Sequence, residues 1–135
     1  MKFFFDNCIS PNIVDALLCL DSRHTLTHLR TKFASNTPDV DWIRALAKEG
    51  GWIVISGDTR ISRGRAERAA WLESQLTTFF FAEGWSNHPL MVQASELFRL
   101  WPTILEHAKS APHGHGYTMG YRANEPRQIY PAPKK

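Results

Sequence analysis

Cysteine is scarce in this sequence, and long hydrophobic runs are lacking. The two cysteines, Cys8 and Cys19, have no secretory context, which favours reduced thiols over a disulfide. The apolar run Phe3–Phe5 near the N-terminus stops at Asp6 and is far too short for a signal peptide or a membrane span. We therefore expect a cytoplasmic protein that makes no membrane contact.

Internal repeats and domain linkers are also lacking. Of the 135 residues, 43% are hydrophobic and 21% are charged, as in ordinary globular proteins, so a fibrous or disordered chain is excluded. This length suits one domain with a continuous core. The net charge of +3 is compatible with a nucleic-acid partner but does not require one.

Short apolar runs alternate with segments of helical period. The pattern predicts strands at residues 2–5, 24–29, 52–56 and 77–82 and helices at residues 11–20, 38–49, 65–75 and 89–108. Ser10 and Thr37 each precede a proline, as helix caps do, and Pro102 is expected to kink or split the last helix. We assign residues 1–111 to the domain and interpret residues 112–135, which contain many helix and strand breakers, as an irregular C-terminal tail.

This alternation predicts an α/β fold with a mostly parallel central sheet and helices on both faces. Right-handed crossovers place the carboxyl ends of all parallel strands at one edge of the sheet. Ligands of such sheets bind at that edge. Polar residues that directly follow a predicted strand are therefore the first candidates for a functional site.

Three acidic residues are predicted to meet at this edge. Asp6 follows the first strand, and Asp58 follows the strand at residues 52–56. Asp39 begins a helix and shares its apolar face, whereas Asp41 lies on the outward face. Three converging carboxylates repel one another unless a cation compensates, and an all-oxygen ligand set favours Mg²⁺ or Mn²⁺. We therefore predict a metal site formed by Asp6, Asp39 and Asp58.

Each acid also has a purely structural interpretation when it is taken alone. Asp6 can cap the following helix, Asp39 can complement a helix dipole, and Asp58 can hold a turn. Their common position at the ends of three elements favours the joint, functional interpretation.

Four segments in this order resemble a known family. They are Phe4–Ser10, His28–Arg30, Thr37–Ile43 and Gly51–Asp58. Together they resemble the PIN-like domains of the VapC45 type, which are related to the small PIN-like toxins of bacterial toxin–antitoxin pairs, over about the first eighty residues. The resemblance implies a PIN-like three-layer sandwich for residues 1–111. It also implies a metal-dependent endoribonuclease, a hydrolase whose Asp6, Asp39 and Asp58 bind Mg²⁺ or Mn²⁺.

The implied chemistry assigns roles to further residues. A metal-activated water attacks an RNA phosphodiester. We expect Asn7 to orient Asp6 or a metal-bound water, and Ser56 or Thr59 to donate a hydrogen bond to a ligand carboxylate. Arginines follow Asp58 and either hold substrate phosphates or form a solvated helix face: Arg60, Arg63, Arg65 and Arg68. The partners implied are RNA, a cognate antitoxin protein and a second copy of the chain.

Three alternatives stay open. PIN nucleases often carry a further acid shortly after the last one, but here position 60 is Arg60, which favours a catalytically weak or inactive PIN-like module that binds RNA or protein. A receiver-like domain needs paired acids after the first strand, where Asp6 is followed by Asn7. A haloacid-dehalogenase-like domain needs an aspartate at the position of Cys8.

Overall fold

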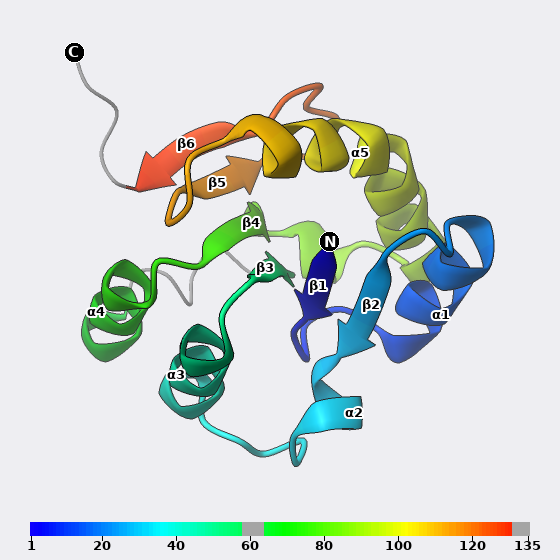
Figure 1. The fold of residues 1–135 in the computed structure, drawn as a ribbon. Helices are drawn as coiled ribbons and strands as arrows, with labels where there is room; N and C mark the ends of the chain where they lie inside the picture. Colours follow the sequence, from blue (N-terminus) through cyan, green and yellow to red (C-terminus); the bar gives the residue numbers. More distant parts are fainter. Residues whose placement is uncertain (58–63, 131–135) are drawn as a thin grey trace.

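The computed structural model describes residues 1–57 and 64–130, which form a six-stranded sheet with helices on both sides (Figure 1). The first half of the chain contains β1 (Lys2–Phe5), α1 (Pro11–Leu20), β2 (Thr25–His28), α2 (Leu29–Lys32), α3 (Asp39–Glu49) and β3 (Trp52–Ser56). The second half contains α4 (Arg65–Ser74), β4 (Thr77–Phe81), a 3₁₀ turn (Trp85–Asn87), α5 (Leu90–Ser110), β5 (Gly116–Met119) and β6 (Arg127–Tyr130).

The strands are arranged in the order β2-β1-β3-β4-β5-β6. All neighbouring pairs are parallel except β5 and β6, which are antiparallel. The predicted α/β class and the mostly parallel sheet are therefore confirmed. The carboxyl ends of β1 to β5 lie at one edge, and β6 starts at that edge because it runs in the opposite direction.

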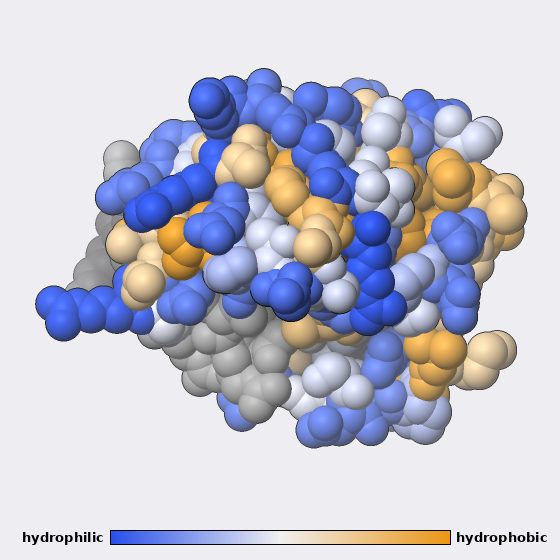
Figure 2. All heavy atoms as spheres, turned by 90° about the horizontal axis from the view of Figure 1, so that it is seen from below, coloured by the Kyte–Doolittle hydropathy of each residue, from blue (hydrophilic) through white to orange (hydrophobic). Residues whose placement is uncertain are grey.

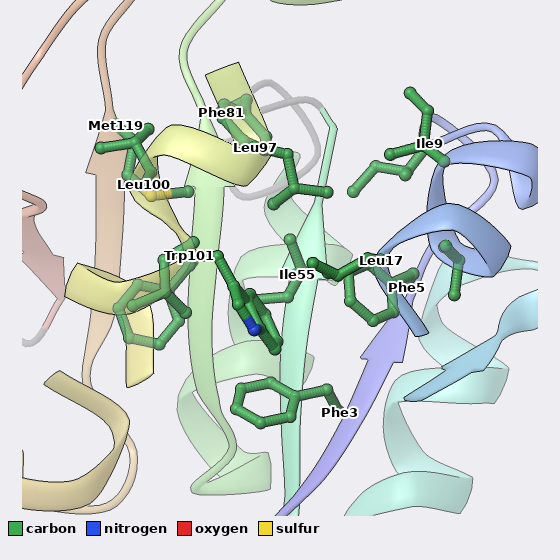
Figure 3. Packing of buried hydrophobic residues seen from close by; sticks show 14 of the residues in the cluster. Phe3, Phe5, Ile9, Leu17, Ile55, Phe81, Leu97, Leu100, Trp101 and Met119 are labelled. Atoms are coloured by element: carbon green, nitrogen blue, oxygen red, sulfur yellow. The ribbon is translucent and has the colours of Figure 1, made fainter. Parts of the chain in front are cut away.

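The sheet separates two hydrophobic clusters, which gives the molecule three layers. Side chains of a strand point alternately to opposite faces, so Phe3 and Phe5 pack towards α1 and α5, whereas Phe4 packs towards α3 and α4. Figure 3 shows Trp101 of α5 lying beside Phe3 of β1 and Ile55 of β3 in the first cluster. Trp71 is fully buried in the second cluster. Both tryptophans are therefore core residues.

Local sequence explains where the helices that flank the candidate site begin and end. The Ser10 side chain accepts a hydrogen bond from the Asn12 backbone N–H at 3.2 Å and caps α1, as predicted. Helix α3 ends at Gly50, whose positive φ of 78° suits glycine. Its cap is Pro38 rather than the expected Thr37, whose hydroxyl instead donates to the Ala34 carbonyl. Helix α3 therefore starts at Asp39.

One expectation about the C-terminal half was wrong, and a second, that Pro102 kinks or splits the last helix, was wrong as to the split. The segment interpreted as an irregular tail contains β5 and β6, which extend the sheet, and Tyr130 is fully buried. Short strands between glycines and prolines lack the length that identifies a strand in a sequence. Pro102 does not split α5, which is continuous over 21 residues. Pro102 is exposed and lies on the helix surface, where its ring meets water instead of the core.

The scarcity of cysteine and of long hydrophobic runs has structural counterparts. Cys8 and Cys19 are both exposed, and no disulfide joins them. Within residues 1–57 and 64–130, no helix combines the length and the apolar composition needed to cross a lipid bilayer.

Candidate metal centre

Asp6 lies at the carboxyl edge of the sheet, between two buried strands. Strands β1 and β3 pair with Phe5 opposite Ile55, so the next positions, Asp6 and Ser56, also lie side by side. Asp6 has the same strand parity as Phe4 and therefore faces the layer formed by α3 and α4. The side chain is 3% exposed. The buried carboxylate thus faces the layer in which α3 begins with Asp39.

Three donors hold the Asp6 carboxylate in place. The Ser56 hydroxyl donates to Oδ2 at 2.5 Å, as predicted for a residue that orients a carboxylate of the cluster. The backbone N–H groups of Cys8 and Gly57 both donate to Oδ1, each at 3.1 Å. An ionised carboxylate has about four acceptor positions, so the donors among the described residues leave about one of them unused, on Oδ2. This remaining lone pair is the one with which Asp6 can ligate a cation.

The environment of Asp6 disfavours its negative charge. Burial raises the pKa of the Asp6 carboxyl to about 6, although the hydrogen bonds from Ser56, Gly57 and Cys8 oppose the rise. The neighbouring Asp39 carboxylate raises the pKa further. A divalent cation at this edge would remove both effects, because it replaces lost hydration and offsets the repulsion between the two acids.

Asp39 is oriented inward by the first turn of α3. Its Oδ1 accepts a hydrogen bond from the indole N–H of Trp42 at 3.0 Å, and Trp42 is fully buried. Asp39 is half-buried, whereas Asp41 is exposed, in agreement with the helical-face argument. The positive end of the α3 dipole lies at the same place and stabilises negative charge there. Asp6 and Asp39 are therefore brought together, and a neutral indole rather than a cation holds Asp39.

Gly57 allows the loop after β1 to pack closely on the end of β3. A Cβ atom at position 57 would lie 2.6 Å from the Cys8 Cβ and 2.8 Å from the Cys8 carbonyl carbon. Only glycine leaves room for this contact. The close approach is what brings the backbone N–H groups of Cys8 and Gly57 onto the same oxygen of Asp6.

Asn7 is a structural link between β1 and the segment that leads into α3. Its amide N–H donates to the Ser35 carbonyl at 2.6 Å, and its Oδ1 accepts from Arg30 Nε at 3.2 Å. These contacts use both polar atoms of the side chain. Asn7 thereby fixes the approach to α3 relative to β1 and, with it, the distance between Asp39 and Asp6. Within the described residues no hydrogen bond joins the Asn7 and Asp6 side chains, so the role of Asn7 in orienting Asp6 or a metal-bound water stays a prediction.

His28 lies at the carboxyl edge of the sheet, at the end of β2, and the sequence analysis assigned it no role in the site. It is 5% exposed, and burial lowers the pKa of its imidazole, so the ring is neutral at pH 7. Nδ1 accepts from the Arg30 backbone N–H at 3.1 Å, so Nε2 carries the proton and donates to the Ile9 carbonyl at 2.7 Å. His28 thus joins the end of β2 to the loop after β1. The available signals were its place in the predicted strand at residues 24–29 and in the segment His28–Arg30 that resembles the PIN-like domains.

Three predicted site residues, Asp58, Thr59 and Arg60, lie outside the described residues. Within residues 1–57 and 64–130, no group of three or more His, Cys, Asp or Glu side chains is placed to hold a metal ion. The described part of the site therefore contributes two carboxylates, Asp6 and Asp39. Two buried or half-buried carboxylates with an unused lone pair are an oxygen donor set of the kind that Mg²⁺ and Mn²⁺ take, so the residues present fit the implied ion.

The surface at this side of the molecule is mainly hydrophilic. Figure 2 views the molecule from below, the side towards which β1 and β2 run in Figure 1, and most of the visible side chains are polar or charged. Hydrophobic side chains gather towards one side of this view. A polar edge suits a charged or hydrated ligand better than an apolar one.

The fold and the paired acids define a class of protein: an α/β domain with a mostly parallel sheet and a carboxylate site at the carboxyl edge. Residues 1–83 match the family model described as PIN like domain. This match covers more than half of the 135 residues, so the chain belongs to the PIN-like domain family. It spans β1 to β4 and includes Asp6, Asp39 and Asp58. No curated protein and no solved structure matches the chain significantly.

Proposed function

We propose that this protein is a Mg²⁺- or Mn²⁺-dependent endoribonuclease that hydrolyses RNA phosphodiesters, with Asp6, Asp39 and Asp58 as the metal ligands. PIN-like domains are often nucleases, which supports the class of activity. The single observation that carries the proposal is the buried Asp6 carboxylate, which faces Asp39 and is held by three donors with a lone pair to spare. Asp58 comes directly after Gly57 in the sequence and is the third ligand of the proposal.

The described residues hold the ligands in fixed orientations. Ser56, Gly57 and Cys8 fix both oxygens of Asp6, and Trp42 fixes one oxygen of Asp39. Ligands that are held in place before binding lose little conformational freedom when a cation arrives, which strengthens binding. When bound, the metal ion supplies Lewis-acid catalysis and a water of lowered pKa for attack on the phosphodiester.

Arg30 is placed to hold an RNA phosphate beside the carboxylates. It is exposed, and its Nε donates to Asn7, the residue that follows Asp6. Within the described part of the chain, its terminal guanidinium N–H groups have no hydrogen bond or ion pair. A guanidinium that is anchored through Nε and free at the other end suits phosphate recognition. Arg60 and Thr59 belong to the proposal as further contacts at this edge.

The biological role we propose follows from the resemblance to toxin-type PIN-like domains. The protein would act in the cytoplasm as the toxin of a bacterial toxin–antitoxin system, bind a cognate antitoxin protein and form a homodimer. None of these partners is required for the chemistry, which depends on the carboxylates.

A second candidate function rests on Arg60. An arginine stands where many PIN nucleases have a further acid, and a site with fewer acids binds metal less tightly. The alternative is a catalytically weak or inactive PIN-like module that binds RNA or protein.

Metal-dependent cleavage of a mixed RNA pool separates the two functions. We expect the wild type to cleave with Mn²⁺ or Mg²⁺ and to be inactive in EDTA. Asp6→Asn and Asp39→Asn should each lower the rate about 100-fold or more, because each removes a charged ligand. Both substitutions keep the size and the acceptor oxygen of the side chain. Asp41→Asn on the outward face of α3 is the matched control and should keep wild-type activity.

Two results would contradict the nuclease proposal. The first is a wild type that does not cleave RNA with any divalent metal, which would favour the binding module. The second is an Asp39→Asn variant as active as Asp41→Asn, which would remove Asp39 from the site.

A further inference from the structure

The turn after β5 lies at the carboxyl edge of the sheet and is ordered by hydrogen bonds, and it is not part of the metal centre. It comprises Gly120–Ala123 and is closed by a hydrogen bond from the Ala123 N–H to the Gly120 carbonyl at 2.9 Å. Arg122 in this turn has a backbone φ of 63°, which residues other than glycine rarely adopt. The turn lies outside the segment that matches the PIN-like family model. Backbone strain of this kind persists only where surrounding contacts enforce it.

An ion pair on α5, between the buried Glu96 and the exposed Arg99, enforces the turn. Glu96 is 8% exposed, and its Oε2 accepts from the Arg122 backbone N–H at 3.0 Å and from Arg99 at 2.8 Å. Arg99 also donates to the Ala123 carbonyl at 2.8 Å. The Glu96 carboxylate and the Arg99 guanidinium therefore both form hydrogen bonds with the backbone of this surface turn. This arrangement orders the two residues at the tip of the turn, Tyr121 and Arg122.

Tyr121 presents an ordered aromatic ring to solvent. Its side chain is 45% exposed, yet the ring stacks on His88, with ring centroids 4.3 Å apart and an interplanar angle of 24°. The Arg122 guanidinium carbon lies 5.2 Å from the centroid of the same ring. Exposed aromatic rings with an adjacent arginine are the means by which proteins bind unpaired nucleobases.

A cleft adjoins this turn at the ends of β4, β5 and β6. Its volume is about 390 Å³, within the range of small-molecule sites. It is lined by Ala82, Thr118, Gly120, Ala123, Glu125 and Arg127. Strand β4 lies between β3 and β5 in the sheet, so the cleft lies beside the strands that carry the acids. Arg127 is exposed at its rim and offers a cation to a phosphate.

We propose that the Tyr121 turn and the adjoining cleft bind an unpaired nucleotide of a single-stranded RNA, whose base stacks on the Tyr121–His88 pair. The inference rests on the proposed ribonuclease function. Asp6 on β1 and the turn after β5 are three strand spacings apart, or roughly 14 Å at about 4.8 Å per strand. At the ~3.4 Å rise of a stacked strand, this span corresponds to about four nucleotides. The subsite therefore holds a base within about four nucleotides of the cleaved bond.

Binding of a fluorescent eight-nucleotide single-stranded RNA to the full chain tests the proposal without any need for cleavage. The measurement is made in EDTA by fluorescence anisotropy. Loss of one stacked base lowers affinity by roughly 5- to 150-fold, so Tyr121→Leu should weaken binding within this range, while Tyr121→Phe should stay within about 2-fold of the wild type. Leu20→Ala, on an exposed apolar residue at the end of α1, is the control and should leave the affinity unchanged.

Arg122→Gly gives a second test in which misfolding is not a concern. Glycine accepts the positive φ, so this variant should melt at the same or a higher temperature than the wild type. Its RNA affinity should nevertheless fall, and the slope of log affinity against log salt should decrease by about 0.7, the value for one phosphate contact on a single strand.

Failure of this inference and failure of the ribonuclease proposal give different results. If Tyr121→Leu and Arg122→Gly bind RNA as the wild type does, the subsite is wrong, whether or not the wild type cleaves RNA. If the wild type binds RNA and loses affinity in both variants but never cleaves with Mn²⁺ or Mg²⁺, the subsite stands and the catalytic proposal is wrong. A wild type that binds no RNA but binds a protein partner through this turn would overturn the subsite.

Discussion

At the scale of single residues, Asp6 is a buried acid whose ionised form destabilises the folded state. Burial and the nearby Asp39 raise the pKa of Asp6 from 3.8 to about 6. Between these two pH values the folded chain keeps a proton that the unfolded chain has released, so the free energy of unfolding falls as the pH rises through this window. Above about pH 6 the loss is complete, and a shift of this size corresponds to about 3 kcal/mol.

We therefore predict that Asp6→Asn stabilises the metal-free protein at pH 7. Asparagine keeps an acceptor for the N–H groups of Cys8 and Gly57, and its amide can donate to the Ser56 hydroxyl, so the hydrogen bonds persist without the charge. The expected gain is up to about 3 kcal/mol at pH 7 and falls to roughly 0.5 kcal/mol near pH 4, where the carboxyl is protonated in the folded state and partly protonated in the unfolded state.

Urea unfolding in EDTA at pH values from 4 to 7 measures this gain. Asp41→Asn is the control, because Asp41 is exposed on the outward face of α3. An Asp6→Asn variant that is less stable than the wild type at pH 7 would show that the carboxylate is a net stabilising group. That result would weaken the case for a site held ready for a cation.

The sequence alone was sufficient to predict the acids but not the groups that hold them. Asp6 and Asp39 follow from strand ends and helical periodicity, two regularities of the backbone. The donors to Asp6 include the N–H groups of Cys8 and Gly57, which every residue except proline possesses. Their role depends on the close packing of two loops that are about fifty positions apart, and no local pattern records such a contact.

At the scale of elements, β5 and β6 complete both faces of the sheet. Tyr130 of β6 is fully buried and packs against Phe80 of β4, with ring centroids 6.2 Å apart. Gly116 of β5 lies against the Tyr130 ring, and a Cβ atom there would overlap the ring. The glycine that made this segment resemble an irregular tail is therefore what allows β6 to pack. Tertiary contact, rather than strand propensity, decides the structure here.

Replacement of Tyr130 by alanine should destabilise the protein by about 3–5 kcal/mol, as for other fully buried aromatic side chains. Tyr121→Ala is a matched control, because Tyr121 is 45% exposed, and it should change the stability by no more than about 0.5 kcal/mol. Chemical denaturation of the two variants makes the comparison. Equal, small effects would mean that residues 112–130 are not part of the cooperative fold.

At the scale of the whole molecule, the carboxyl edge of the sheet gathers the features that we connect with function. Asp6, Arg30 and the Tyr121 turn lie there because each follows the carboxyl end of a parallel strand, and α3 begins there because it leads back to the start of β3. The fold class was predictable because the buried strands are continuous apolar runs separated by amphipathic helices. The Tyr121 turn was not predictable, because its order comes from Glu96 and Arg99 on a distant helix.

Our account of the site requires that Asp6 and Asp39 bind a divalent cation. Thermal unfolding of the protein during a Mn²⁺ titration measures this binding. We predict that the stability of the wild type rises with the logarithm of the Mn²⁺ concentration above the dissociation constant, by about 2.7 kcal/mol at one hundred times that constant. Asp41→Asn should show the same rise, whereas Asp6→Asn and Asp39→Asn should lose most of it. A wild type that Mn²⁺ and Mg²⁺ do not stabilise, or an Asp39→Asn variant that responds as Asp41→Asn does, would contradict the claim.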